Sequence, residues 1–199
     1  MRAMKLVGAV LMIGMLAAFA GCAKAPEETV AAVQSGIESA RSAGAETYAS
    51  DEFAKVNATF QQAQAEIEVQ NGKFALFRSY KNAEALLAQA QTEAQQAQEA
   101  AVAGKERARN EATAAIDNAR AALQAATDFL AQAPRGKGTR AELDAMQQEL
   151  TTLQASLDEA TGGMAGEDYI NAKIKAELVT QKANEIQADV QAAITKVRG

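Results

Sequence analysis

The stretch "YKNAEALLAQAQTEAQQAQEAA" (residues 80–101) decides the fold of this 199-residue chain. Its apolar seam advances in alternating steps of three and four residues, at Tyr80, Ala83, Leu87, Ala90, Ala94, Ala97 and Ala101. This spacing is typical of a helix that packs against other helices at a shallow angle. Because most seam positions are alanine, neighbouring helix axes can approach closely, and we expect a core built largely from methyl groups.

The same stride continues on both sides of this stretch and extends the helical prediction over most of the chain. The other predicted seam residues are Val30, Val33, Ile37, Ala40, Phe53, Val56, Phe60, Ala63, Ile67, Leu76, Ala108, Ala112, Ala115, Ala119, Leu123, Ala126, Leu130, Leu143, Met146, Leu150, Leu153, Leu157, Ala160, Tyr169, Ala172, Ala176, Val179, Ala183, Ile186, Val190, Ala193 and Val197. Good helix formers dominate the composition, and almost no long β-branched run suggests a sheet. We therefore predict an all-α fold, an elongated antiparallel bundle or coiled-coil-like array of about five helices.

Four short segments interrupt the stride and predict the turns between helices. They are residues 42–50, 70–73, 133–139 and 161–168. Ser50 is the predicted N-cap of one helix, and Thr139 with Glu142 in "TRAE" predicts a capping box for another. Gly104 also interrupts the seam. A single glycine only weakens a helix, so the sequence leaves open whether one long helix continues through it.

The predicted helices repeat once along the chain. Three sets of residues match in the same order: "GIESARSA" (36–43) with "AIDNARAA" (115–122), Phe53, Phe60 and Ile67 with Leu143, Leu150 and Leu157, and "SYKNA" (79–83) with "DYINA" (168–172). Alanine-rich helices align easily by chance, but the conserved order favours an internal duplication. We predict a first helical unit at residues 29–104 and a second at residues 105–199, with a linker at residues 133–139.

The start of the chain has the layout of a secretory signal. Arg2 and Lys5 form a short positive region, residues 6–20 form an uncharged apolar run, and "AGC" follows. The run is shorter than the roughly 20 residues that a membrane-spanning helix needs. Cys22, the only cysteine of the chain, lies directly after it. An uncleaved anchor with an incidental cysteine is the alternative interpretation.

The sequence "FAGC" resembles the lipobox of bacterial lipoproteins, in which small residues precede a cysteine. The resemblance implies that signal peptidase recognises the three residues before the cysteine, Phe19, Ala20 and Gly21. It also implies that residues 1–21 are removed and that the Cys22 thiol carries lipid. Phe19 stands where the family usually has leucine. Several acyl chains on one residue give a stable membrane anchor, whereas a single chain gives only marginal binding.

The residues after Cys22 predict where the protein is held. In Gram-negative lipoproteins an aspartate after the cysteine commonly retains the protein at the inner membrane, so Ala23 implies the periplasmic face of the outer membrane. We expect residues 22–28 to form a lipidated tether. Loss of Arg2 and Lys5 with the signal peptide changes the net charge from −5 to −7. This acidity suits a body held off an anionic membrane surface.

Residues 42–97, which begin with "SAGAETYASDEF" and end with "GKFALFRSYKNAEALLAQAQTEAQQA", resemble an uncharacterised bacterial lipoprotein domain family. The resemblance implies alanine-rich paired helices, rather like tetratricopeptide hairpins, and a location in the cell envelope. It implies no chemistry, because its motifs are packing motifs.

The composition argues against several kinds of site. The chain has no histidine, which removes the commonest general base and metal ligand. A net charge of −5 argues against nucleic acid as a partner, because phosphate binding needs clustered lysine and arginine. We interpret the acidic pairs Asp158–Glu159 and Glu167–Asp168 as solvated charge rather than acid–base or calcium-binding groups. We therefore expect no enzyme activity, metal or cofactor.

The aromatic residues have two interpretations. Tyr80 and Tyr169 stack on a ligand or, as we prefer, wedge a hairpin open near its turn with the hydroxyl in water. We expect Phe74 and Phe77 to pack in the first hairpin. Phe129, with the neighbouring Leu130, is expected to close the end of the long helix.

These features predict a lipid-anchored, non-enzymatic envelope protein that acts as a spacer, scaffold or adaptor in the periplasm. Its partners are the membrane, through lipid on Cys22, and another protein or a second copy of the chain, through free helix faces. The alternative is a helical binding module or holdase for envelope peptides or lipids. Its groove would need exposed apolar residues outside the seam, for which Phe77, Leu86 and Leu178 are the candidates.

Overall fold

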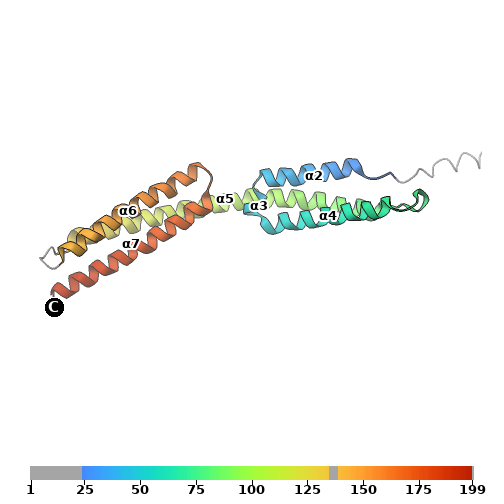
Figure 1. The fold of residues 1–199 in the computed structure, drawn as a ribbon. Helices are drawn as coiled ribbons and strands as arrows, with labels where there is room; N and C mark the ends of the chain where they lie inside the picture. The colour runs from blue at the N-terminus through green and yellow to red at the C-terminus, as the bar shows by residue number, and fades with distance from the viewer. Residues whose placement is uncertain (1–23, 135–138, 199) are drawn as a thin grey trace, which may run out of the picture. The chain divides into compact units, whose positions relative to one another are not determined.

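The computed structural model describes residues 24–134 and 139–198 of the protein (Figure 1). Its elements in chain order are α2 (Glu27–Ser42), α3 (Ala45–Tyr48), α4 (Ser50–Asn71), the 3₁₀ helix η2 (Ala75–Phe77), α5 (Lys81–Gln132), α6 (Arg140–Ala165) and α7 (Tyr169–Arg198). No strand occurs among these residues, and the five long helices have between 16 and 52 residues. The predicted all-α class is confirmed.

The chain divides into two compact units between Val102 and Ala103, a point inside α5. Unit 1 contains α2, α3, α4 and the first part of α5, and unit 2 contains the rest of α5 with α6 and α7. The division expected from the sequence, after Gly104, lies two residues further on. Gly104 does not end α5, because the helix continues on both sides of it.

The core of unit 1 is the predicted seam. Val33 of α2, Val56 of α4 and Leu87 of α5 are fully buried, and the alanines between Ala90 and Ala101 on the α5 seam lie in the same cluster. The close approach that small residues permit is visible at Gly36, where a Cβ atom would lie only 3.3 Å from the Cβ of Ala94. A larger side chain at Gly36 would push α2 away from α5.

The corner between α2 and α4 depends on a glycine. Gly44 has φ of 89°, in the left-handed region, and a Cβ atom there would lie 3.0 Å from Cδ2 of Tyr48. Glycine adopts this conformation without the steric cost that other residues meet. Gly44 therefore lets the chain turn into α3 and then into α4.

The buried cluster of unit 2 contains more leucine, isoleucine and valine side chains than the buried cluster of unit 1. Leu157 of α6 and Val179 and Val190 of α7 are among its fully buried side chains, and half-buried Phe129 packs against it from the last turn of α5. Surface ion pairs join its elements: Lys173 Nζ lies 2.8 Å from Glu111 Oε2, and Lys175 Nζ lies 2.7 Å from Glu159 Oε2. Both pairs are exposed, so we assign the stability of the unit to the apolar seam.

The predicted seam is wrong at two places among the described residues. Leu76 is exposed, because α5 begins only at Lys81 and the stride does not extend back through η2. Near the end of α7 the buried position after Val190 is Ile194, while Ala193 is half-buried. The steps from Ile186 to Val190 and from Val190 to Ile194 are both four residues long, so the buried seam shifts by one residue relative to the prediction. Val197 lies outside the residues whose side chains are described.

Three predicted turn features also differ. Thr139 makes no capping bond at the start of α6, and its hydroxyl donates instead to the Pro134 carbonyl at 3.1 Å. Ser50 is already the first residue of α4, so Ala49 is the N-cap. The predicted turn at residues 161–168 is shorter than expected, because α6 continues through Gly162 and Gly163 to Ala165.

The matched sequence blocks occupy corresponding helices of the two units. The first pair lies on α2 and on the part of α5 within unit 2, and the second pair lies on α4 and α6. The third pair places Tyr80 just before α5 and Tyr169 at the start of α7, and both residues are buried. The Tyr80 hydroxyl donates to Asn71 Oδ1 at 2.5 Å, so the prediction that it reaches water is wrong.

Candidate functional site

The residues predicted for lipidation and signal-peptidase recognition lie outside the described residues: Cys22, Phe19, Ala20 and Gly21. The description begins at Lys24, and α2 begins at Glu27. The predicted tether at residues 22–28 is therefore too long by two residues. Glu27 and Glu28 join the helix because acidic side chains interact favourably with the positive end of the helix dipole.

A surface hollow of about 440 Å³ lies where the chain enters α2. It is lined by Ala25 and Pro26 before α2 and by Ile67 and Asn71 near the end of α4. Figure 1 shows the start of α2 and the loop after α4 at the same end of unit 1. The residues that lead towards Cys22 thus lie against the last turns of α4.

The loop after α4 is held by a set of hydrogen bonds. The Arg78 guanidinium donates to the carbonyls of Asn71 and Lys73, at 3.0 Å each. The Ser79 amide donates to Gln70 Oε1 at 3.1 Å, and Gln70 is itself buried. Together with the hydrogen bond from Tyr80 to Asn71, these contacts join residues 78–80 to residues 70–73 at the end of α4. They fix the conformation of residues 74–77, which lie between the two joined segments.

This loop displays large apolar side chains to solvent. We name the side chains of Phe74, Leu76 and Phe77, which are 70%, 78% and 76% exposed, the aromatic tip. The two phenylalanine rings lie together, with centroids 6.4 Å apart. The prediction that Phe74 and Phe77 pack in the first hairpin is wrong, because η2 turns them outward instead of continuing the stride of α5.

A second apolar surface lies on α7. Ile170, Ile174 and Leu178 are exposed and recur every four residues, so they form a stripe on one face of the helix. Of the three residues predicted for a binding groove, Phe77 and Leu178 are exposed, whereas Leu86 is half-buried and packs against the core of unit 1. Phe77 belongs to unit 1 and Leu178 to unit 2.

The sequence analysis missed a buried carboxylate in unit 1. Glu93 of α5 is 4% exposed, and its Oε1 accepts a hydrogen bond from Gln89 Nε2 at 2.9 Å and lies 3.2 Å from Lys55 Nζ. Its Oε2 is buried without a geometrically good hydrogen bond among the described residues. The signal was present in the sequence, because Glu93 follows Ala90 by three residues and therefore shares its inward face.

The environment of Glu93 favours the charged form. Burial opposes ionisation and by itself raises the pKa of the carboxyl. Hydrogen bonding to the side chains of Gln89, Thr59 and Lys55, with the lysine charge, outweighs this effect and holds the pKa below its usual value. We interpret Glu93 as a link between α4 and α5, because its charged partner Lys55 comes from α4.

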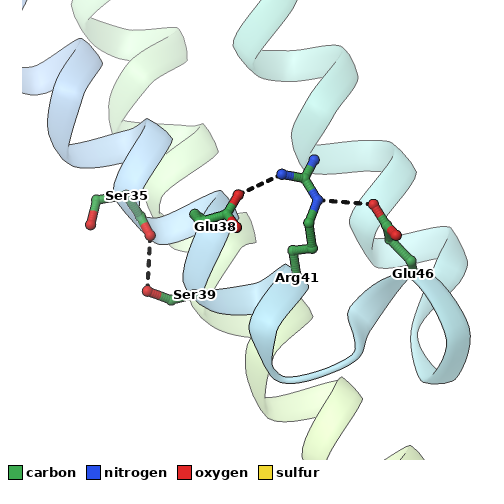
Figure 2. Close-up of polar contacts among 5 residues, drawn as sticks. All are labelled: Ser35, Glu38, Ser39, Arg41 and Glu46. Carbon is green, nitrogen blue, oxygen red and sulfur yellow. Dashed lines mark hydrogen bonds and ion pairs between the residues drawn. The ribbon is translucent and has the colours of Figure 1, made fainter.

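A polar cluster marks the corner after α2 (Figure 2). Arg41 Nη1 donates to Glu38 Oε2 at 2.5 Å and its Nε donates to Glu46 Oε1 at 2.9 Å, while its guanidinium carbon lies 5.5 Å from the centre of the Phe53 ring. The hydrogen bonds from Arg41 to Glu46 and to Glu38 raise the pKa of the guanidinium above its usual value. The cluster connects α2, α3 and α4, so we interpret it as a brace for the corner.

The predicted acidic pairs are exposed. Glu159 pairs with Lys175, and Glu167 accepts a hydrogen bond from Lys105 Nζ at 2.6 Å. Across residues 24–134 and 139–198, no three acidic, cysteine or histidine side chains gather in a group that could hold a metal ion. None of the described helices is both long enough and apolar enough to cross a bilayer.

Models of known protein families, curated proteins and solved structures were each compared with the chain, and none of the three comparisons finds a match.

Proposed function

We propose that the protein is a bacterial lipoprotein, anchored through lipid on Cys22 at the periplasmic face of the outer membrane, that acts as a non-enzymatic spacer, scaffold or adaptor. The observation that carries the proposal is the order of features at the start of the chain. A short positive segment, an uncharged apolar run and a single cysteine are followed within five residues by the first helix of the described structure.

The helical units suit such a role. Their apolar seams are buried within each unit, and most of the remaining helix surface is polar. The proposed mechanism is geometric: lipid on Cys22 holds one end of the chain at the membrane, and the helices present their free faces to a partner. The stripe of Ile170, Ile174 and Leu178 is the surface that we assign to a protein partner, because an exposed apolar stripe on a helix can lie in a groove of another protein.

The anchoring part of the proposal is tested by labelling the full chain with a fatty acid in a Gram-negative host, followed by mass spectrometry of the purified protein. We expect a mature form that begins at Cys22 and carries lipid. Cys22→Ser removes the only cysteine and should leave an unacylated precursor. A lipid-bearing mature form of Cys22→Ser, or an unmodified parent chain, would contradict the proposal.

The adaptor role is tested by photo-crosslinking in cells from Leu178, within the apolar stripe, with exposed Gln98 of α5 as the matched polar position. A discrete partner captured from Leu178 and not from Gln98 would support an adaptor. Cross-links only between copies of the chain would favour a homo-oligomeric spacer.

The alternative function, a helical binding module or holdase, is favoured by the same exposed apolar side chains, since Phe77 and Leu178 are open to unfolded peptides or lipids. Capture of many unrelated envelope proteins from Leu178 would support it. Thermal stabilisation of the protein by extracted envelope lipids or peptides would do so independently.

A further inference from the structure

We propose that the aromatic tip inserts into the interface of the bilayer that carries the lipid anchor, so that unit 1 touches the membrane at a second point. The identity of this bilayer rests on the proposed function, because it is the membrane to which Cys22 is attached. The contact itself is a property of Phe74, Leu76 and Phe77 and needs no lipid on the chain.

The first argument is the exposure of the tip in a loop of fixed conformation. Among the described residues, eight large apolar side chains are exposed, and four of them (Val69, Phe74, Leu76 and Phe77) lie within nine residues of one another. The loop is tied down by Arg78, Gln70 and Tyr80, so a defined backbone conformation holds these side chains in water. A concentrated apolar surface of this kind marks an interaction site.

The second argument is charge. Between Asn71 and Lys81 the chain carries no Asp or Glu, and its exposed cations are Lys73 and Lys81, while the Arg78 guanidinium holds the loop. The nearest acidic side chains at this end of unit 1, Glu27 and Glu68, line the hollow beside the loop. The mature chain as a whole is acidic, so this segment is a local exception. Each lysine or arginine close to an anionic bilayer strengthens binding by roughly fivefold. Apolar side chains with adjacent cations fit an interface of acyl chains and anionic headgroups. This pairing favours a bilayer over a protein partner.

The third argument is position. Ala25 and Asn71 line the same hollow, so they lie close together at one end of unit 1. Ala25 is three positions after Cys22 in the chain, and Phe74 is three positions after Asn71. An extended chain of three steps spans at most about 10 Å. Lipid on Cys22 would therefore hold the bilayer near the aromatic tip. This proximity gives the tip a high effective concentration at the interface.

The second contact would orient unit 1. A single point of attachment leaves the attached body free to rotate about it, whereas two neighbouring contacts restrict this rotation. Insertion of the tip would thereby point the end of unit 1 that carries α3 away from the membrane, because α3 lies at the opposite end of unit 1 from the tip (Figure 1).

The chain offers a direct test because it contains no tryptophan. Phe74→Trp and Phe77→Trp each place one fluorophore on the tip, and Gln98→Trp places one at an exposed position of α5, beside the end of α2 that lies far from the tip. The lipidated full chain is reconstituted into vesicles of phosphatidylethanolamine and phosphatidylglycerol with brominated acyl chains. We expect blue-shifted emission and quenching by bromine for the two tip variants, and neither effect for Gln98→Trp.

A second set of variants tests the charges. Lys73→Gln with Lys81→Gln, made in the Phe77→Trp chain, should lower the ratio of inserted to free tip by roughly 25-fold on anionic vesicles, at fivefold for each charge. The matched control, Lys175→Gln with Lys182→Gln on α7, removes the same charge far along the sequence and should leave the quenching unchanged. All four lysines lie at the surface, and the tip lysines make no side-chain ion pair among the described residues.

The outcomes separate this inference from the proposed function. Absence of bromine quenching from the tip, in a preparation whose Cys22 carries lipid by mass spectrometry, would overturn the inference and leave the lipoprotein proposal standing. Quenching by a chain whose Cys22 still carries no lipid after expression in a Gram-negative host would support the tip contact, and the missing lipid would overturn the anchor. Equal quenching of Gln98→Trp would overturn a contact confined to the tip. Protection of the tip by an added envelope protein, but not by vesicles, would overturn the inference in favour of a protein partner.

Discussion

Replacing Leu150 by aspartate tests the assignment of the buried seam in unit 2. Leu150 is 3% exposed on α6 and belongs to the apolar cluster formed by α5, α6 and α7. The aspartate side chain would replace a member of this apolar cluster, at the base of a surface hollow that Arg120 and Gln124 also line. Leu178→Asp on α7 is the matched control, because that leucine is 54% exposed.

The expected loss of stability follows from two contributions. Removing a fully buried leucine side chain costs about 2–3 kcal/mol of apolar burial. Removing a carboxyl group from water at this position adds about 1–3 kcal/mol. We expect a combined loss of about 4 kcal/mol, which approaches the whole stability of many small domains. The control substitution should change stability by less than about 0.5 kcal/mol, as surface substitutions usually do.

Urea denaturation followed by circular dichroism at 222 nm measures the loss, and its pH dependence provides an internal check. Burial raises the pKa of the introduced aspartate above its unfolded value of about 3.9, so the penalty for charge is present at neutral pH. As the pH falls towards that value the folded state takes up a proton, and the difference between Leu150→Asp and the parent should shrink. An unchanged denaturation midpoint for Leu150→Asp, or equal effects of the two substitutions, would refute the assignment of the buried face.

Three further predictions concern single residues. Glu93→Gln should remove an acid-sensitive contribution to stability. The pKa of Glu93 is lowered in the folded state, so the parent should lose this contribution below about pH 4.3, as the pH falls through the folded pKa. Between pH 7 and pH 3.5 the urea midpoint should therefore fall less for the variant than for the parent. Gly44→Ala should destabilise unit 1 by about 1–2 kcal/mol, because φ at this position is 89° and lies in the left-handed region. Gly162→Ala is the opposite case, since Gly162 lies within α6 and no neighbouring element lies within 4 Å of the added Cβ. It should stabilise the protein by up to about 1 kcal/mol. Tyr80→Phe should cost about 1 kcal/mol through loss of the hydrogen bond to Asn71; a melting temperature equal to that of the parent would show that this bond contributes nothing.

The helices and their buried faces were the most predictable part of the structure. Alternating steps of three and four identify the inward face of a helix directly, and residues such as Val33, Leu87 and Leu157 are buried as that rule requires. The order of the repeats also indicated which helices correspond. The presence of helices in both units therefore followed from local spacing alone.

The loop after α4 was not predictable in the same way. Leu76 continues the spacing of α5 in sequence, but the helix begins only at Lys81, and spacing has no meaning outside a helix. The positions of Phe74 and Phe77 depend on η2 and on the bonds made by Arg78, which join residues five and seven positions apart in an irregular segment. No periodic signal encodes such contacts.

Buried polar residues were missed for another reason. Thr59, Gln70 and Glu93 lie on inward faces but are polar, so a search for apolar periodicity passes over them. Each follows a predicted seam residue by three positions, as Glu93 follows Ala90. Testing polar residues at these positions would have identified all three as candidates for buried contacts.

The alanine-rich seams bear on how stability changes with temperature. Unfolding exposes less apolar surface per residue when the core contains methyl groups in place of larger side chains, and exposed apolar surface is the main source of the heat-capacity increase on unfolding. We therefore expect unit 1, whose α5 seam from Ala90 to Ala101 consists of alanines, to fall below the usual value of roughly 12–15 cal/mol/K per residue. A small heat-capacity increment flattens the curve of free energy against temperature, so unit 1 would keep a nearly constant stability over a wide thermal range and resist denaturation in the cold.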